Sequence, residues 1–160
     1  MNRKKKSNNR KNLKQIFIKE TEPMYKEIYI TTEHGESLVD ITNQVKQSVS
    51  DSGVQEGICA LFIPHTTAGI TINSCADQLT LTDIVSETKR LVPTRVDFNH
   101  ILDTPTDAAG HIKSVFVGNS LTLIITDGQL KVGEFQSILF FEFDGPRSRK
   151  LLIRIMSEKE

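Results

Sequence analysis

The chain has 160 residues, 38% of them hydrophobic and 25% charged, a composition typical of a globular protein with one hydrophobic core. No apolar run approaches the roughly 18 residues of a membrane-spanning helix, and polar residues stand where a signal peptide would be apolar. With only two cysteines, Cys59 and Cys75, we exclude a disulfide framework and expect a protein of the reducing cytoplasm.

The charge is balanced overall but unevenly distributed. Residues 1–14 contain seven Lys or Arg and no acidic residue, which leaves 13 basic and 20 acidic residues in the remainder. We predict a basic, disordered tail over residues 1–20 and a single domain over residues 21–160. The acidic body argues against nucleic-acid binding by the fold, and a solvated tail is favoured over one that contacts RNA or an acidic surface.

Two strands separated by an amphipathic helix are predicted in the first part of the chain. The helix is predicted from apolar residues at every fourth position, and the glycine at position 53 is expected to end it. The segments concerned are residues 25–32 for the first strand, Ile41, Val45 and Val49 for the helix, and residues 58–63 for the second strand.

Two further helices are predicted in the middle of the chain. The apolar stripe over residues 81–92 predicts a helix that Pro93 ends, and Asp77 is a candidate for its N-cap. The run Thr-Pro-Thr-Asp from position 104 predicts the start of the next helix, with Thr106 as its N-cap and Gly118 at its end.

The last third of the chain has the pattern of β-structure. Apolar residues on both sides of Asp127-Gly128 predict a hairpin with a type I′ turn. Two more strands are predicted at residues 137–143 and 151–156. Strands outnumber helices, so the predicted class is α+β, dominated by antiparallel sheet.

A polar stretch over residues 64–73, with the sequence PHTTAGITIN, directly follows a predicted strand. Functional groups often lie where a rigid strand gives way to a turn. The hydroxyls of Thr66 and Thr67 could bind an anion together with turn amides, and Gly69 would allow close approach of the backbone. A Thr-rich strand with a bulge is an equally good interpretation.

Three histidines could form a metal site. His65, His100 and His111 lie in polar surroundings, and three neutral imidazoles can hold a divalent transition metal while leaving a position open. Their separations of 35 and 11 residues form no local chelate. From spacing alone, separate surface or core histidines remain the alternative.

Charged residues in the second half are further candidates. Arg147 follows a turn and could bind phosphate, or it could protect an exposed strand end with the basic residues beside it. Glu142 interrupts an apolar strand and either faces water or is held in a site. Lys113 and His111 lie on different faces of the predicted helix, so one could serve a site while the other faces solvent.

Taken together, these segments resemble the YjbQ-like family, also called the secondary thiamine-phosphate synthase family, over about residues 25–156. The motifs that carry the resemblance are His65-Thr66-Thr67-Ala68-Gly69-Ile70-Thr71-Ile72-Asn73, His100, Gly110-His111-Ile112-Lys113, Gly133-Glu134-Phe135-Gln136 and Glu142-Phe143-Asp144-Gly145-Pro146-Arg147-Ser148-Arg149.

The resemblance implies a compact α+β fold with about three helices and a sandwich-like core of largely antiparallel sheets, usually assembled as a homotrimer. It also implies that His65, His100 and His111 converge in a pocket and can hold a divalent metal ion. Zinc or another transition metal suits imidazole ligands, and magnesium would be possible with a diphosphate substrate.

The activity that the resemblance implies is a weak thiamine-phosphate synthase reaction. Hydroxymethylpyrimidine diphosphate is joined to a thiazole phosphate and diphosphate is released, so the enzyme must position the reactants and stabilise the leaving group. The residues that would bind substrate phosphates are Thr66, Thr67, Asn73, Lys113 and Arg147, and the carboxylates that would act as acid, base or supporting groups are Asp83 and Glu142.

Two alternative functions remain open from the sequence. A histidine cluster favours transition metals, whereas diphosphate usually recruits magnesium, which makes metal-assisted hydrolysis of a small phosphorylated compound a second hypothesis. This chain also departs from the family at Ser74, where a carboxylate is common, and at Phe135, where tryptophan is usual. These departures motivate a third hypothesis, an oligomeric protein that binds such a ligand without catalysis. No membrane partner is expected.

Overall fold

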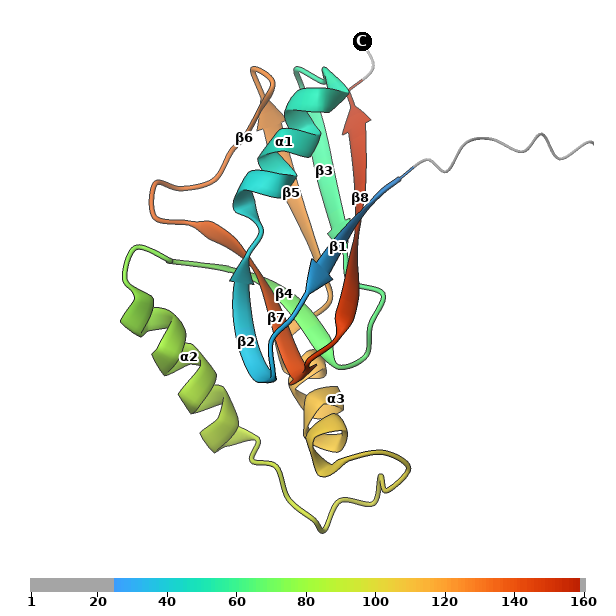
Figure 1. Cartoon of the computed structure of the whole chain (residues 1–160). Coiled ribbons are helices and arrows are strands. Elements are labelled where there is room, and N and C mark those ends of the chain that lie inside the picture. The colour runs from blue at the N-terminus through green and yellow to red at the C-terminus, as the bar shows by residue number, and fades with distance from the viewer. Residues whose placement is uncertain (1–24, 159–160) are drawn as a thin grey trace, which may run out of the picture.

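The computed structural model describes residues 25–158, which form two β-sheets and three helices (Figure 1). The predicted basic tail, residues 1–20, lies outside the described residues. The elements in chain order are β1 (Lys26–Thr31), β2 (Gly35–Asp40), α1 (Thr42–Ser52), β3 (Gly57–Phe62), β4 (Ala68–Asn73), α2 (Gln78–Leu91), α3 (Pro105–Val117), β5 (Ser120–Thr126), β6 (Gln129–Leu130), β7 (Ser137–Gly145) and β8 (Ser148–Ser157).

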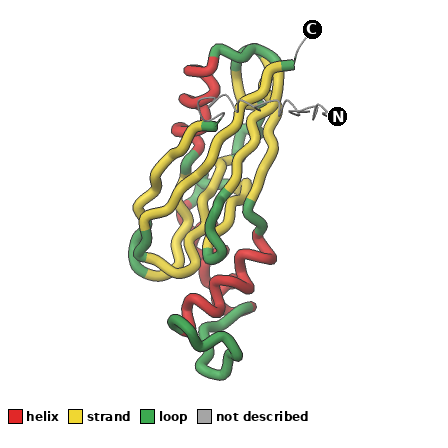
Figure 2. The backbone as a smooth tube through the Cα atoms, turned by 90° about the vertical axis from the view of Figure 1, so that its right-hand side faces the viewer, coloured by secondary structure: helices red, strands yellow, loops and turns green. Residues whose placement is uncertain are grey.

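The strands of both sheets pair in antiparallel fashion. One sheet has the order β1-β8-β3-β5-β6 and the other the order β2-β7-β4. Seen from the side, the strands run next to one another along the length of the molecule (Figure 2). The predicted α+β class with a sandwich-like core is confirmed. Because β3 and β4 belong to different sheets, the link over residues 63–67, which contains His65, crosses from one sheet to the other.

The hydrophobic core lies between the two sheets, and strand β7 shows how alternation builds it. Ile138 and Phe140 belong to this core together with residues of β1, β3, β5 and β8. Phe141 and Phe143 point to the opposite face, on which α3 packs. Residues 138–144 are all buried as a result. A charged residue within this run must therefore find its partners inside the protein.

Helix α1 confirms the helix that the four-residue apolar repeat predicted. Val45 and Val49, with Ile41 at the N-cap position, are fully buried in the core between the sheets. The helix ends at Gly53, whose φ of 69° lies in the left-handed region that glycine adopts without strain.

The predicted helices in the middle of the chain are present, with one correction. Asp77 caps α2, because its carboxylate accepts a hydrogen bond from the backbone N–H of Leu79. The N-cap of α3 is Thr104, and the prediction of Thr106 was wrong. The hydroxyl of Thr104 accepts the N–H of Asp107, and proline at the next position has no N–H that needs a partner.

The hairpin and the cysteines also agree with the sequence pattern. Asp127 and Gly128 have φ values of 54° and 71°, as a type I′ turn requires. Both cysteines are free thiols, and burial raises the pKa of Cys59 to about 11, which makes it an inert core residue. Among residues 25–158, no helix combines the length and the apolar character needed to cross a bilayer.

Candidate metal centre

Helix α3 presents two potential metal ligands on one face. Asp107 and His111 are four residues apart, about one helical turn, and the His111 Nε2 atom lies 3.3 Å from Asp107 Oδ2. Asp107 stands in the first turn, where the exposed N–H groups of the helix favour a negative charge. The cap at Thr104 holds this turn and therefore the carboxylate.

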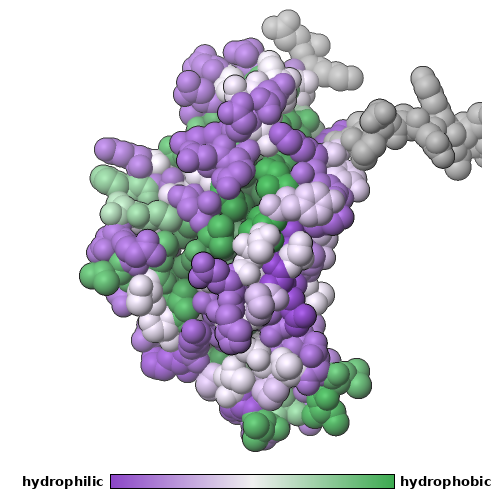
Figure 3. Space-filling view, in the orientation of Figure 1, coloured by the Kyte–Doolittle hydropathy of each residue, from purple (hydrophilic) through white to green (hydrophobic). Residues whose placement is uncertain are grey.

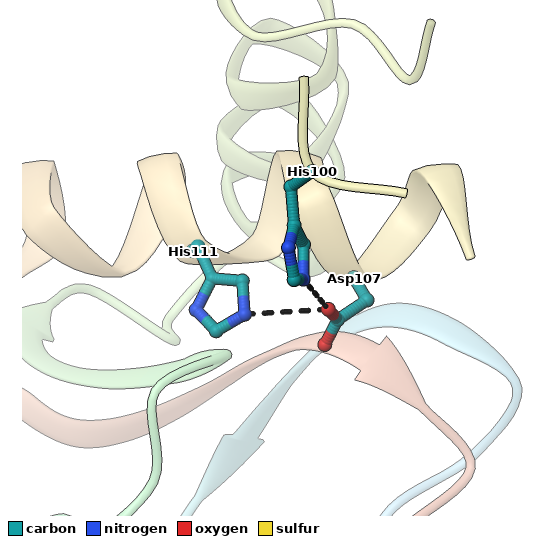
Figure 4. A group of neighbouring side chains, drawn as sticks. All are labelled: His100, Asp107 and His111. Atoms are coloured by element: carbon teal, nitrogen blue, oxygen red, sulfur yellow. Dashed lines mark hydrogen bonds and ion pairs between the residues drawn. The ribbon is translucent and has the colours of Figure 1, made fainter. Parts of the chain in front are cut away.

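His100 completes the group from the connection between α2 and α3 (Figure 4). Its Nε2 atom lies 2.9 Å from the same Oδ2 of Asp107, and the two imidazole rings meet edge to face with centroids 5.2 Å apart. The donor atoms of the three residues all lie within 4.8 Å of one another. Both imidazoles are 40% exposed and the carboxylate 13%, so a small ligand can reach the group from solvent.

The donor set and its spacing fit a divalent transition metal. Two imidazoles and a carboxylate are ligands that zinc and related ions take, and three protein ligands leave one tetrahedral position open. With bonds of about 2.0–2.1 Å, the ligands of tetrahedral zinc lie about 3.3 Å apart. The nitrogen–oxygen separations of 2.9 and 3.3 Å at Asp107 are close to that value.

Asp107 is the candidate ligand that the sequence analysis missed. A signal was available, because Asp107 and His111 have the i, i+4 spacing that places two side chains on one face of a helix. His100 lies in the loop before the helix, and its contact with the same carboxylate could be seen only in the folded structure.

In the described part of the chain, His65 is not a member of this group of donor atoms. It stands in the link between β3 and β4, and its Nε2 atom accepts a hydrogen bond of 2.8 Å from the backbone N–H of Lys150. Burial, followed by the positive charge of Arg149, lowers the pKa of the imidazole below its ordinary value. The structure thus brings together two of the three predicted histidines, with Asp107 as the third donor.

Glu142 is fully buried and accepts four hydrogen bonds. Its Oε1 atom accepts from the backbone N–H of Asp144 and from Arg149, and its Oε2 atom accepts from the Thr32 hydroxyl and from Arg149. Burial alone would raise the pKa of this carboxyl, but the bonds from Arg149 and Asp144 outweigh it and hold the pKa below its ordinary value. Glu142 is therefore an ionised internal partner with both oxygens in use.

Arg149 also fastens the link that contains His65. One of its terminal nitrogens donates to the Thr67 hydroxyl at 2.9 Å, and the Thr67 carbonyl accepts the N–H of Phe143. Helix α3 lies directly against this link, since a Cβ atom on Gly110 would lie 3.1 Å from Thr67 Cβ. Glycine at this position allows the close approach, and it places the metal group of α3 beside the link.

Lys113 points into the protein. Its side chain is 1% exposed and forms an ion pair of 2.5 Å with Glu36 on β2. The predicted difference between the faces of Lys113 and His111 is present, with His111 in the solvent-accessible group and Lys113 on the buried side. A carboxylate already neutralises the ammonium group of this candidate phosphate ligand.

Arg147 lies in the turn between β7 and β8 and keeps its guanidinium 44% exposed. It binds Asp144 through a 2.5 Å contact, and this hydrogen bond raises the pKa of the arginine. A longer contact of 3.9 Å reaches Asp103, which belongs to the same connection as His100. Of the predicted phosphate ligands, Arg147 therefore has an exposed cation next to the segment that contains His100.

The other predicted site residues are at the surface. Thr66 lies in the link, Asn73 at the end of β4 and Asp83 on α2, and all three are exposed. The Asn73 amide oxygen accepts the N–H of Ser74. Within residues 25–158, no hydrogen bond or ion pair connects these three residues to His100, Asp107 or His111.

Sequence comparison finds one family and several relatives. The sequence model of the family described as UPF0047 protein YjbQ-like matches residues 26–158. A UPF0047 protein of Methanocaldococcus jannaschii is 45% identical over 130 residues, which cover 81% of this chain and 92% of the relative. The UPF0047 protein YugU of Bacillus subtilis is 36% identical over 133 residues, which cover 83% of this chain and 99% of the relative.

Solved structures with the same fold accompany these relatives. A crystal structure from Sulfolobus solfataricus, described as a YbjQ-like protein of unknown function, has a TM-score of 0.79 at 33% identity and covers 84% of this chain and 96% of its own. A YjbQ/UPF0047 protein from Clostridium acetobutylicum, described as uncharacterised, has a TM-score of 0.77 at 41% identity and covers 82% and 99%. The likeness thus extends over almost the whole described domain.

Proposed function

This chain belongs to the UPF0047 YjbQ-like family, and from that membership we propose that it is a metal-dependent enzyme acting on a small phosphorylated compound. The observation that carries the proposal is the group of His100, Asp107 and His111, whose donor atoms lie within 4.8 Å of one another and can be reached from solvent. A divalent transition metal held there supplies a Lewis acid toward phosphate oxygens or water.

Thiamine-phosphate synthesis is the reaction that we assign first. In this reaction a carbon–oxygen bond to diphosphate breaks and a bond forms from the thiazole nitrogen to the pyrimidine methylene carbon. The protein must hold two phosphorylated reactants with their reacting atoms aligned, and it must stabilise the charge of the departing diphosphate. The exposed guanidinium of Arg147 and the exposed hydroxyl of Thr66 are suited to bind phosphate oxygens.

The carboxylates have different roles in this proposal from the acid–base roles first considered. Glu142 acts by positioning, because it fixes Arg149 and through it the link at Thr67. Asp107 acts as a ligand. Asp83 is exposed on α2, and within residues 25–158 no hydrogen bond or ion pair connects it to His100, Asp107 or His111.

Metal-assisted hydrolysis is the second candidate reaction, and one specific observation favours it. The donor set contains two imidazoles, whereas magnesium, the usual partner of diphosphate, prefers oxygen ligands. A zinc-type site with one open position is suited to water as the fourth ligand. The competing substrate class is then a phosphate ester, with water as the nucleophile.

We also propose that the protein functions as a homotrimer. Large apolar side chains are exposed next to the metal group: Val96, Ile101 and Leu102 in the α2–α3 connection are 92%, 79% and 91% exposed. Hydrophobic residues gather at this end of the molecular surface (Figure 3). Monomeric proteins rarely expose large contiguous apolar patches. We therefore expect these apolar residues to be buried by contact with further copies of the chain.

The activity assay should compare three proteins. The wild type, His111→Ala and His34→Ala are incubated with hydroxymethylpyrimidine diphosphate and thiazole phosphate, with added zinc or magnesium, and thiamine phosphate is quantified. His34 is exposed in the turn before β2 and serves as the matched control. We expect formation of product by the wild type and the control and loss of most activity in His111→Ala. Full activity in His111→Ala would refute the assignment, and turnover of phosphate esters alone would favour hydrolysis.

A further inference from the structure

The hydrogen bond to His65 determines which of its ring nitrogens carries the proton. Nε2 accepts the backbone N–H of Lys150 at 2.8 Å, and an accepting nitrogen cannot itself be protonated. A neutral imidazole has one N–H group, which must then be on Nδ1. Nδ1 has no hydrogen-bond partner among the described residues, and the ring is half-buried. His65 consequently offers a free N–H donor.

This donor is held in place from two sides. Lys150 and Arg149 are neighbours on β8, and Arg149 donates to the Thr67 hydroxyl two positions after His65. The Arg149 guanidinium is in turn fixed by Glu142. An imidazole whose acceptor side is bonded and whose backbone is fastened keeps its N–H direction without reorganisation, which favours ligand binding.

The surroundings of the ring favour an anionic ligand. The positive charges of Arg149 and Lys150 act on His65 against the negative charge of Glu142, and the next residue in the chain, Thr66, is exposed. His65 and Thr66 lie in the link that α3 contacts through Gly110, the residue before His111. The segment that carries His65 is therefore in contact with the helix that carries Asp107 and His111.

We propose that His65 is an anion-binding residue that donates its Nδ1–H to a phosphate oxygen of the ligand, and that it is not a metal ligand. The inference deepens the proposed function and rests on it for the class of ligand. It assigns distinct tasks to the three histidines: His100 and His111 hold the metal with Asp107, and His65 recognises the phosphate.

The first test determines the tautomer in the folded wild-type protein. In a sample labelled with ¹⁵N-histidine, long-range correlations to the ring carbons identify which nitrogen carries the proton. We expect a protonated Nδ1 and an unprotonated Nε2 for His65, with a change in the Nδ1 resonance when inorganic diphosphate is added. A protonated Nε2, or a His65 resonance that diphosphate leaves unchanged, would overturn the proposal.

The second test separates phosphate binding from metal binding by substitution. Asparagine places an amide N–H near the position of Nδ1, whereas glutamine reaches the position of Nε2 and alanine has neither group. We expect diphosphate affinity to fall about tenfold to a hundredfold in His65→Ala and His65→Gln, as for a lost hydrogen bond to a charged group, and to be largely retained in His65→Asn. The metal content should be unchanged in all three.

Loss of metal from His65→Ala or His65→Asn would show that His65 is a ligand and overturn the inference. This outcome is distinguishable from failure of the proposed function. If the wild type forms no thiamine phosphate and hydrolyses no phosphate ester, the proposed enzyme function fails, whereas the tautomer, diphosphate affinity and metal content still decide the role of His65.

Discussion

Glu142 and Arg149 lie side by side at the polar end of an apolar core, where either charge alone would be very unfavourable. Each is less than one-tenth exposed, and together they bind Thr32 on one side and Thr67 on the other. A buried pair of this kind contributes little net stability compared with apolar packing, but it defines a unique arrangement of the groups around it. Here the arrangement includes the link that carries His65.

Replacement of Glu142 by glutamine should destabilise the fold strongly. The substitution preserves the shape of the side chain but leaves the Arg149 charge buried without a counter-charge, and loss of one member of such a pair lowers the free energy of unfolding by about 3–5 kcal/mol. Urea denaturation measures the change. Glu27→Gln is the control, because Glu27 pairs with Lys150 at the surface, and it should have little effect. Equal stability of Glu142→Gln and the wild type would contradict this account of the pair.

The same carboxylate predicts how stability depends on pH. The pKa of Glu142 is lower in the folded protein than the ordinary carboxyl value of about 4.3, so the folded state binds fewer protons than the unfolded state in this range. The stabilisation is complete above the ordinary pKa and is lost as the pH falls through the folded pKa. Unfolding free energies from pH 7 to pH 3 should therefore converge for the wild type and Glu142→Gln. Parallel curves would rule this mechanism out.

At the residue scale, the sequence drew attention to side chains whose surroundings only the structure shows. His100 and His111 are candidates by the chemistry of imidazole, Arg147 as a guanidinium after a turn, and Glu142 because it interrupts an apolar strand. Whether Glu142 faced water or an internal partner could not be decided, since Arg149 and Thr32 reach it only through pairing of distant strands. Asp107 was overlooked although its spacing to His111 was visible in the chain.

At the scale of elements, the first turn of α3 positions Asp107, one of the proposed metal ligands. Thr104 caps the helix and accepts the N–H of Asp107, which supplies the carboxylate that faces both histidines. A frayed first turn would displace this carboxylate, so the cap supports the site as well as the helix.

Thr104→Ala should therefore lower both stability and metal affinity. Loss of an N-cap hydroxyl costs about 1 kcal/mol of unfolding free energy, and the carboxylate next to it becomes less well positioned. Thr106→Ala is the matched control, because Thr106 lies within the first turn and does not cap it. Thermal denaturation and zinc titration of both variants measure the effects. If the two substitutions had the same effect, Thr104 would have no special role.

The elements themselves were largely predictable because their patterns are local. Four-residue apolar spacing in α1, a cap and a proline around α2, and Asp-Gly between β5 and β6 each depend on neighbouring residues. The N-cap of α3 was placed two residues too late because two threonines flank Pro105 and both are acceptable caps by type. Only the hydrogen bond to Asp107 distinguishes them.

At the scale of the whole molecule, assembly is the property that the single chain suggests most directly. The exposed apolar residues of the α2–α3 connection flank His100, so a trimer contact there would also limit access of water to the metal group. In the sequence these residues had no heptad or other repeat that would indicate an interface.

Substitution of Leu102 should disrupt the proposed trimer. Leu102 is 91% exposed in the single chain, and an aspartate buried at a subunit contact would lack a partner. Sedimentation equilibrium should give the mass of three chains for the wild type and for the control Thr122→Asp, which changes an exposed residue on β5, and a lower mass for Leu102→Asp. A monomeric wild type would refute the trimer.

The antiparallel α+β class could be predicted from the sequence pattern and the sandwich-like core from the family resemblance, but the contacts that make the site could not. Thr32 meets Glu142 across 110 positions of sequence, and Lys113 meets Glu36 across 77. Such pairs depend on the order of strands in each sheet and on a link that crosses between them, neither of which leaves a periodic signal. His65 lies in that link, whereas His100 lies in the α2–α3 connection and His111 on α3.

The metal content of the protein tests the central claim most directly. The wild type, His111→Ala and the exposed control His34→Ala are purified without an affinity tag, dialysed against zinc and then against metal-free buffer, and analysed by atomic emission. We predict about one transition-metal ion per chain in the wild type and the control, and loss of this ion in His111→Ala. A wild type without bound metal, or a full complement in His111→Ala, would contradict a metal centre at His100, Asp107 and His111.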